Sequence, residues 1–159
     1  MLDEKARKAT LRMITYGLYA LGAEADGLIA VSTVTWLTQA SFEPPLVALG
    51  VKKTSRPFQL LSKSRKLAVS FLESGQRDLA YAFFKPTDRS ENTIGGFPFE
   101  VATTGAPILS DALGYLEAKV VNIDETGDHA VVIAEVINAV VKRQGTPLTL
   151  RELGLNYGG

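Results

Sequence analysis

Two long runs of β-branched and apolar residues lie close together in the C-terminal part of the sequence. Residues 115–123 read YLEAKVVNI, residues 129–141 read HAVVIAEVINAVV, and DETGD joins them. Val and Ile favour a pleated, half-buried surface, and Gly127 supplies the permissive backbone that a hairpin turn needs. The pair predicts a long antiparallel hairpin, which restricts the chain to folds built on an antiparallel sheet.

Shorter apolar runs elsewhere predict further strands. They are found at 17–23, 28–36, 46–51 and 66–72, with one more short candidate in the tail 147–159. Helices are expected at 2–14, 57–64 and 76–84. Pro57 suits the first turn of a helix, and residues 85–107, rich in Gly and Pro, are expected to form a long ordered loop with short extended pieces. This balance predicts a mainly β chain, a barrel or a sandwich, with two or three helices.

Composition excludes several classes of function. The formal net charge is zero, so no long-range field recruits nucleic acid or an anionic membrane. The chain has no cysteine and a single histidine, His129, which excludes disulfides, thiolate chemistry and multi-histidine metal sites. No apolar run approaches the roughly 18 residues of a membrane span, and the charged N-terminus does not read as a signal peptide. We expect one cytoplasmic domain over residues 1–159.

A hydroxyl-rich segment is the first candidate for a binding site. Strand alternation places Thr33 and Thr35 on one face, with Thr38 and Ser41 at the strand exit. Hydroxyls and unpaired backbone N–H groups at such a strand end can bind a polar heterocycle. The alternative is a partly solvated strand, because Thr is simply a good β residue.

A basic segment, residues 52–66, is the second candidate. It contains six Lys or Arg and no acid. Its first part lies between a buried strand and a helix N-terminus, where a phosphate would meet free N–H groups, two hydroxyls and up to three cations. These residues are Lys52, Lys53, Thr54, Ser55 and Arg56. The alternative is a solvated basic face, with Ser55 or Arg56 only capping the helix.

The third candidate is Gly127-Asp128-His129 at the predicted hairpin turn. A neutral histidine can hydrogen-bond a ligand, and the adjacent carboxylate would bias its protonation. A Ser-His-Asp triad is not favoured, because no nucleophile-elbow motif is present. The alternative is an ordinary loop histidine.

These segments, with the motifs between them, follow a definite order. They are TVTWLTQASFEPPL at 33–46, VALGVKKTSRPFQLLSKSRKLAVSFL at 47–72, Gln76 with Leu79, Ala80 and Phe83, Gly105 with Pro107 and Leu109, Leu116-Glu117, and Gly127-Asp128-His129 ahead of Glu135. In this order they resemble the flavin reductase-like, FMN-binding family, from about Thr10 to the end of the sequence.

The resemblance implies a fold and a site. The fold would be a six-stranded antiparallel Greek-key split β-barrel that binds FMN near the interface of a homodimer, with no metal. The residues implied to line the isoalloxazine and ribityl chain are Thr33, Val34, Thr35, Trp36, Leu37, Thr38 and Ser41. Those implied to hold the phosphate are Lys52, Lys53, Thr54, Ser55 and Arg56. His129 would be the catalytic residue at the flavin edge, where the nicotinamide approaches.

The resemblance also implies an activity, NAD(P)H:flavin oxidoreductase. A hydride would pass from NADH or NADPH to FMN, and electrons would pass onward to free flavin, a partner oxygenase or flavoprotein, oxygen or ferric iron. The alternative is a non-catalytic FMN-binding electron-transfer module that serves such a partner. A nucleic-acid binder is disfavoured, because residues 52–66 lack an aromatic stacking platform. The hairpin 115–141 is apolar on both faces, which independently predicts a homodimer.

Overall fold

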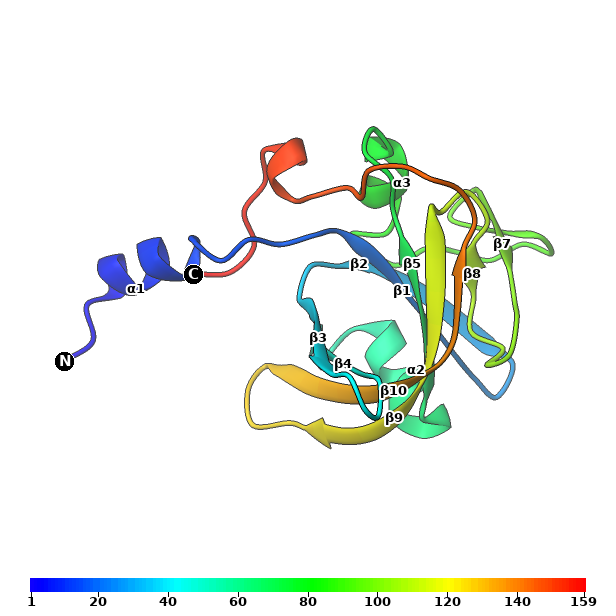
Figure 1. The fold of residues 1–159 in the computed structure, drawn as a ribbon, viewed down its shortest axis with the longest axis horizontal. Helices are drawn as coiled ribbons and strands as arrows, with labels where there is room; N and C mark the ends of the chain where they lie inside the picture. Colours follow the sequence, from blue (N-terminus) through cyan, green and yellow to red (C-terminus); the bar gives the residue numbers. More distant parts are fainter.

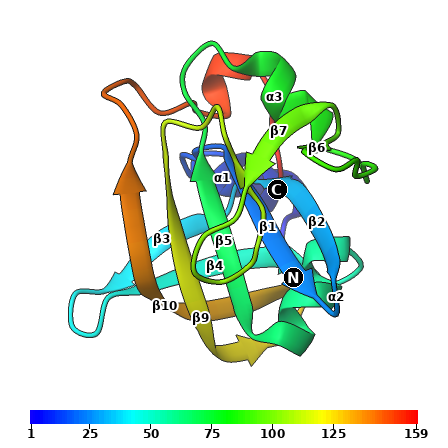
Figure 2. The ribbon, with the colours of Figure 1, turned by 90° about the vertical axis from the view of Figure 1, so that its right-hand side faces the viewer.

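The main feature of the fold, described by a computed structural model for all of residues 1–159, is a seven-stranded antiparallel sheet (Figures 1 and 2). The strand order is β2-β1-β5-β9-β10-β4-β3. The strands are β1 (Tyr19–Ala25), β2 (Leu28–Val34), β3 (Leu37–Ser41), β4 (Leu46–Lys52), β5 (Lys66–Phe71), β9 (Gly114–Asp124) and β10 (His129–Val141). The mainly β prediction is confirmed, and β9 and β10 form the expected hairpin.

The two edge strands of this sheet are neighbours in the chain. Only Thr35 and Trp36 separate β2 from β3, although these strands lie at opposite ends of the strand order. The sheet therefore has to curl until its edges approach each other at this link. The count of seven strands differs from the expected six, since the residues after Trp36 pair with β4 as a separate strand rather than forming only a strand exit.

The remaining elements are short. They are α1 (Glu4–Leu11), α2 (Arg56–Ser64), α3 (Arg77–Ala82), a three-residue 3₁₀ turn at Arg151–Leu153, and a small sheet of β6 (Thr93–Ile94), β7 (Phe97–Glu100) and β8 (Ile108–Leu109). Helix α2 packs on β1 and β2. Ser55 caps it by accepting a hydrogen bond from the Phe58 N–H, and Phe58 and Leu61 are buried beneath it. None of the helices has the length and apolar character needed to cross a bilayer.

Helix α1 departs from its prediction. A helix is predicted over 2–14, whereas α1 covers Glu4–Leu11, has no buried residue and projects away from the sheet (Figure 1). Local interactions account for its formation, because Asp3 caps its first turn and Glu4 pairs with Arg7 at 2.6 Å. The predicted helix is therefore confirmed over a shorter range.

Two apolar cores lie on opposite sides of β1 and β5. Leu21 and Val69 belong to the core within the curled sheet, whereas Leu18 and Leu72 belong to a second core that includes α3 and the small sheet. The chain after β10 packs over the second core and contributes Leu148, Leu150 and Leu153 to it.

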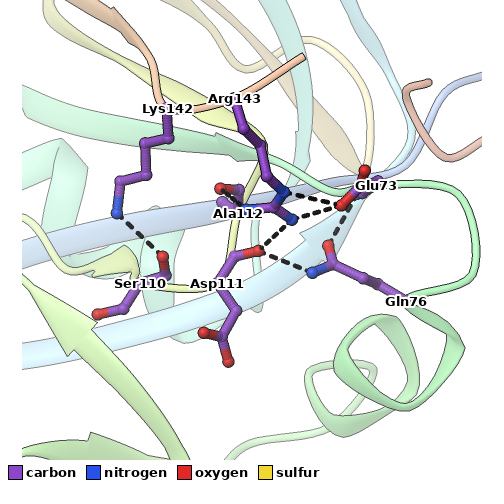
Figure 3. A network of polar contacts seen from close by, with 7 residues as sticks. All are labelled: Glu73, Gln76, Ser110, Asp111, Ala112, Lys142 and Arg143. Carbon is purple, nitrogen blue, oxygen red and sulfur yellow. Dashed lines mark hydrogen bonds and ion pairs between the residues drawn. The ribbon is translucent and has the colours of Figure 1, made fainter. Parts of the chain in front are cut away.

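The segment after β10 has no strand of its own, so the short strand expected there is absent. It forms single bridges at Glu73–Pro147 and Gly17–Thr149 and buries Leu148 and Leu150. Its start is held by Arg143, which donates to Glu73 and to the carbonyls of Asp111 and Ala112 (Figure 3). These contacts direct the chain back across the end of the sheet, toward α1 (Figure 1).

Candidate functional site

A cavity of about 400 Å³, here termed the ring cavity, lies where β2 ends beside β4 and β10. An adjoining hollow of about 230 Å³, the anion hollow, opens beside α2. Both share the walls made by Ser32, Lys52, Ser55 and Phe84. The ring cavity is otherwise lined by Thr33, Val34, Thr35, Gly50, Val51, Phe83, His129, Leu150, Leu155, Asn156 and Tyr157. The two spaces form one site, since they meet along these shared walls.

The two β2 threonines of the ring cavity differ in their hydrogen bonds. Thr33 is tied to α3, because its hydroxyl donates to the Ala80 carbonyl at 2.7 Å. Thr35 is only 8% exposed, and its hydroxyl has no hydrogen-bond partner. Leaving a buried hydroxyl unpaired costs about 1–3 kcal/mol. A ligand that bonds Thr35 after a small local movement exposes the hydroxyl to the ring cavity would recover this free energy.

The anion hollow has three cations and no acid in its lining. The cations are Lys52, Arg56 and Lys85, and none of them forms an ion pair with a carboxylate. Arg56 reaches across the hollow and donates to the Thr87 carbonyl at 3.4 Å. The N-terminus of α2 adds its positive dipole end. These features suit an anion with several oxygen atoms, such as a phosphate.

His129 lies at the wall of the ring cavity, as the first residue of β10. Its Nδ1 lies 2.8 Å from the Asp128 carboxylate, and its Nε2 lies 2.5 Å from the Tyr157 hydroxyl. A carboxylate only accepts, so a neutral His129 carries its proton on Nδ1, and Nε2 accepts from Tyr157. The hydrogen bond from His129 lowers the pKa of Asp128. Burial, followed by the charge of Asp128, raises the pKa of Tyr157, which keeps its hydroxyl protonated.

Trp36 forms the back of this arrangement. Its ring lies 4.6 Å from His129 and 5.2 Å from Tyr157, measured between ring centroids. The indole N–H is buried and has no partner. Gly50 lies against the indole, and a side chain there would meet the Trp36 ring at 2.7 Å. Trp36 therefore fixes the position of the His129–Tyr157 pair.

A model of the flavin reductase like domain family matches residues 11–156. The chain belongs to this family. It is 32% identical over 159 residues to diflavin flavoprotein A 1 of Synechocystis, covering 98% of this chain but only 28% of that protein. It is 25% identical over 159 residues to a flavin reductase of Pseudomonas putida, covering 99% of this chain and 91% of that protein.

Solved structures agree with this assignment. The NADH:FAD oxidoreductase of Streptomyces globisporus, in complex with NAD and FAD fragments, superposes with a TM-score of 0.76 at 28% identity. The superposition covers 93% of this chain and 91% of that one. The family resemblance seen in the sequence is thus confirmed, because the family model matches nearly the whole chain and the fold superposes on a solved flavin reductase-like structure.

Most of the expected site residues of this flavin reductase-like chain come together. Thr33, Val34, Thr35, Lys52, Ser55 and His129 line the ring cavity, Thr54 and Arg56 line the anion hollow, and Trp36 lies behind His129. The segments that supply them are far apart in the sequence. The predicted set of three segments therefore meets at one place.

Four expected residues lie elsewhere. Leu37, Thr38 and Ser41 line a separate apolar groove of about 690 Å³ beside β9 and β10, because the chain crosses to the other edge of the sheet at Trp36. Lys53 supports the β9–β10 turn, donating from Nζ to the Glu125 carbonyl at 2.9 Å and from its N–H to the Asp128 carbonyl at 3.1 Å. Neither group is placed to line the ring cavity or the anion hollow.

Several lining residues were not expected, and three of them, Phe84, Lys85 and Tyr157, bear directly on the site. Phe84 and Lys85 follow α3 and line the anion hollow, although the sequence assigned Phe84 to a helix end. The sequence feature that could have indicated them is the aromatic pair Phe83-Phe84 followed by Lys85 and Pro86. Tyr157 had no local signal, because it reaches His129 only when the chain after β10 folds back.

Proposed function

We propose that this chain binds FMN in the ring cavity and the anion hollow and reduces it with NADH or NADPH, as an NAD(P)H:flavin oxidoreductase. The observation that carries the proposal is the junction of the two spaces. A hydroxyl-bearing cavity with an unpartnered Thr35 adjoins an acid-free hollow with three cations, and four residues line both spaces. A flat heterocycle joined by a short chain to a phosphate fits this junction. The flavin reductases among its relatives support the same reading.

The residues present fit FMN, and each has a distinct task. The Thr35 hydroxyl would bond a polar edge of the ring, and Lys52, Arg56 and Lys85 would hold the phosphate. Bound flavin would supply the redox chemistry by accepting a hydride from the reduced nicotinamide. His129 would orient the nicotinamide at the open edge of the ring cavity, with Asp128 fixing its tautomer.

Flavin titration tests the proposal. Purified protein is titrated with FMN, FAD and riboflavin, and bound flavin is then mixed with NADH or NADPH while its absorbance is followed. We expect FMN to bind with a Kd of about 1 μM or below, and riboflavin to bind about tenfold more weakly or worse, because it lacks the phosphate. The absence of flavin binding at micromolar concentrations would refute the proposal. Comparison of the FMN and FAD titrations shows which of these two flavins the protein prefers.

Replacement of Thr35 by valine separates binding from folding. Valine has the same shape but no hydroxyl, so Thr35→Val should leave the ligand-free protein as stable or about 1 kcal/mol more stable. FMN should bind about 3- to 10-fold more weakly, because one hydrogen bond is lost. Thermal unfolding and FMN titration measure the two effects, with Thr38→Val, outside the ring cavity, as the control. Unchanged FMN affinity in Thr35→Val would show that the hydroxyl faces no flavin atom.

An electron-transfer module is the second candidate, and one observation favours it. The chain corresponds to 28% of the diflavin flavoprotein that it matches, so a domain of this type occurs within a larger flavoprotein. Stopped-flow reduction distinguishes the two functions. Rapid bleaching of bound flavin by NADH supports the reductase, whereas slow bleaching with fast transfer from a partner supports the module.

We also propose that the curled sheet is a Greek-key split barrel of one cytoplasmic domain that pairs with a second copy. Strand β10 exposes Val131, Ile137, Val140 and Val141; the last two line the apolar groove, and Val141 is 76% exposed. Exposed apolar side chains gathered on one strand are typical of a subunit contact. Sedimentation should give a dimer, and Val141→Lys should shift it toward the monomer. A wild-type monomer at micromolar concentration would contradict the pairing.

A further inference from the structure

Residues 154–159, here termed the tail, pass from the wall of the ring cavity to helix α1. The segment just before the tail is firmly held. Leu150 and Leu153 are buried, and the Glu152 carboxylate accepts from the Ser74 hydroxyl at 2.6 Å and from the Gly75 N–H at 2.8 Å. The tail itself contributes Leu155, Asn156 and Tyr157 to the cavity wall. The well-anchored residues 150–153 are therefore followed by a segment that closes part of the ring cavity.

The tail is held much more weakly than its base. Residues 156–159 form no backbone–backbone hydrogen bond. Their hydrogen bonds are the Tyr157–His129 bond and a long one of 3.4 Å from the Arg12 Nε to the Gly158 carbonyl. The Tyr157 ring also lies edge-on to Trp36, and Gly159 lies against Lys8 and Arg12. Few hydrogen bonds and high exposure are the marks of a segment that opens locally.

Gly154 lies between the well-anchored segment that ends at Leu153 and the weakly held tail. It has a φ of +66°, in the left-handed region, and nothing lies within 4 Å of the place where a side chain would begin. A glycine with free space around it can change its backbone angles without a clash. Gly154 is thus placed to act as the hinge of the tail.

The closed tail occupies the partners that a nicotinamide would use. Asp128 and Tyr157 engage the two ring nitrogens of His129, so no nitrogen of His129 is free to bond a nucleotide. The Tyr157 ring also lies in the wall of the cavity, beside His129 and against Trp36. A second ring can reach this side of the cavity only if Tyr157 moves.

We propose that Tyr157 is a gate residue that controls access of the nicotinamide nucleotide: its hydroxyl latches the tail onto His129, and the tail swings about Gly154 when the nucleotide enters. This inference rests on the proposed reductase function. Because only the open form accepts the nucleotide, the apparent affinity is reduced by the fraction of molecules that are open. Tyr157 thereby sets the KM for NADH or NADPH without taking part in hydride transfer.

Loss of the latch has a definite kinetic signature. Tyr157→Phe keeps the ring and removes the hydrogen bond, so the open fraction rises. We expect the KM for NADH to fall about 2- to 10-fold, a larger change than any in kcat or in FMN affinity. Tyr81→Phe, an exposed tyrosine on α3 outside both spaces, is the matched control and should behave as wild type. An increase or no change in KM for Tyr157→Phe would overturn the gate.

Trp36 provides a readout that needs no flavin. It is the only tryptophan of the chain, and both Tyr157 and His129 lie against its ring. In the flavin-free protein, Tyr157→Phe and Tyr157→Ala should increase quenching of Trp36 fluorescence by acrylamide, because the tail no longer covers the indole. Quenching equal to wild type in both variants would show that no latch exists. Circular dichroism confirms that the variants are folded.

The two readouts separate the gate from the proposed function. If wild-type protein binds flavin and Trp36 responds but the KM does not fall, the gate is refuted and the reductase stands. If wild-type protein binds no flavin, the reductase and the nicotinamide part of the gate both fail. The Trp36 measurement then still decides whether Tyr157 latches the tail.

Discussion

Arg56→Glu is expected to weaken FMN binding by about 100-fold or more while leaving riboflavin affinity within about twofold. The substitution removes a charge-assisted hydrogen bond worth about 1.5–3 kcal/mol and places a negative charge beside the phosphate. Riboflavin has no phosphate and is insensitive to this change. Arg56 is exposed and begins α2, where a carboxylate favours the helix dipole, so the fold should be unaffected.

Parallel titrations of the wild type and the variant with FMN and riboflavin measure this effect. Lys63→Glu is the control, because Lys63 is exposed in the last turn of the same helix and outside both spaces of the site. The control reports the effect of net charge alone. Equal losses for FMN and riboflavin in Arg56→Glu would place the phosphate somewhere other than the anion hollow.

Glu117→Gln is expected to destabilise the fold by about 3 kcal/mol. Glu117 is fully buried in β9, and its carboxylate accepts four hydrogen bonds. The donors are the N–H groups of Thr103 and Thr104, the Thr104 hydroxyl and the Asn138 side chain, at 2.7–3.0 Å. A glutamine would turn an N–H₂ group toward donors and leave them unpaired. Denaturant unfolding measures the loss, with the exposed Glu135→Gln of β10 as the control.

The same residue predicts an acid-dependent loss of stability. Burial raises the pKa of Glu117, but the hydrogen bonds from Asn138, Thr104 and Thr103 outweigh it, so the net pKa is lower than usual. A lowered folded-state pKa stabilises the fold above the unfolded value of about 4.3, and this contribution is lost as the pH falls through the folded value. The difference in unfolding free energy between wild type and Glu117→Gln should therefore shrink below about pH 4. A difference that stays constant with pH would show that Glu117 is not charged in the fold.

The regular elements could be predicted from the sequence because their determinants are local. Long runs of β-branched and apolar residues predicted β9 and β10, and the Ser55–Pro57 sequence predicted the start of α2 to within one residue. Capping and strand alternation act between residues a few positions apart. The burial of α1 could not be predicted in this way, because a helical period says nothing about whether another surface is there to cover it.

The candidate site was only partly predictable for the same reason. The threonine-rich segment looked uniform, yet Thr35 lines the ring cavity whereas Thr38 lines the separate groove. Both also border a third hollow of about 580 Å³. The difference arises at Trp36, where the chain passes from one edge of the curled sheet to the other. The pattern of hydroxyls carries no information on this crossing.

Most strands of the large sheet, the basic turn before α2, the β9–β10 hairpin and the family were predictable from the sequence, since they depend on neighbouring residues and on the order of motifs. Which polar groups meet depends on the tertiary structure. The unpartnered hydroxyl of Thr35 and the contact between His129 and Tyr157, 28 positions apart, follow from the curl of the sheet and the return of the chain after β10. Long-range packing sets these contacts, and no local pattern encodes them.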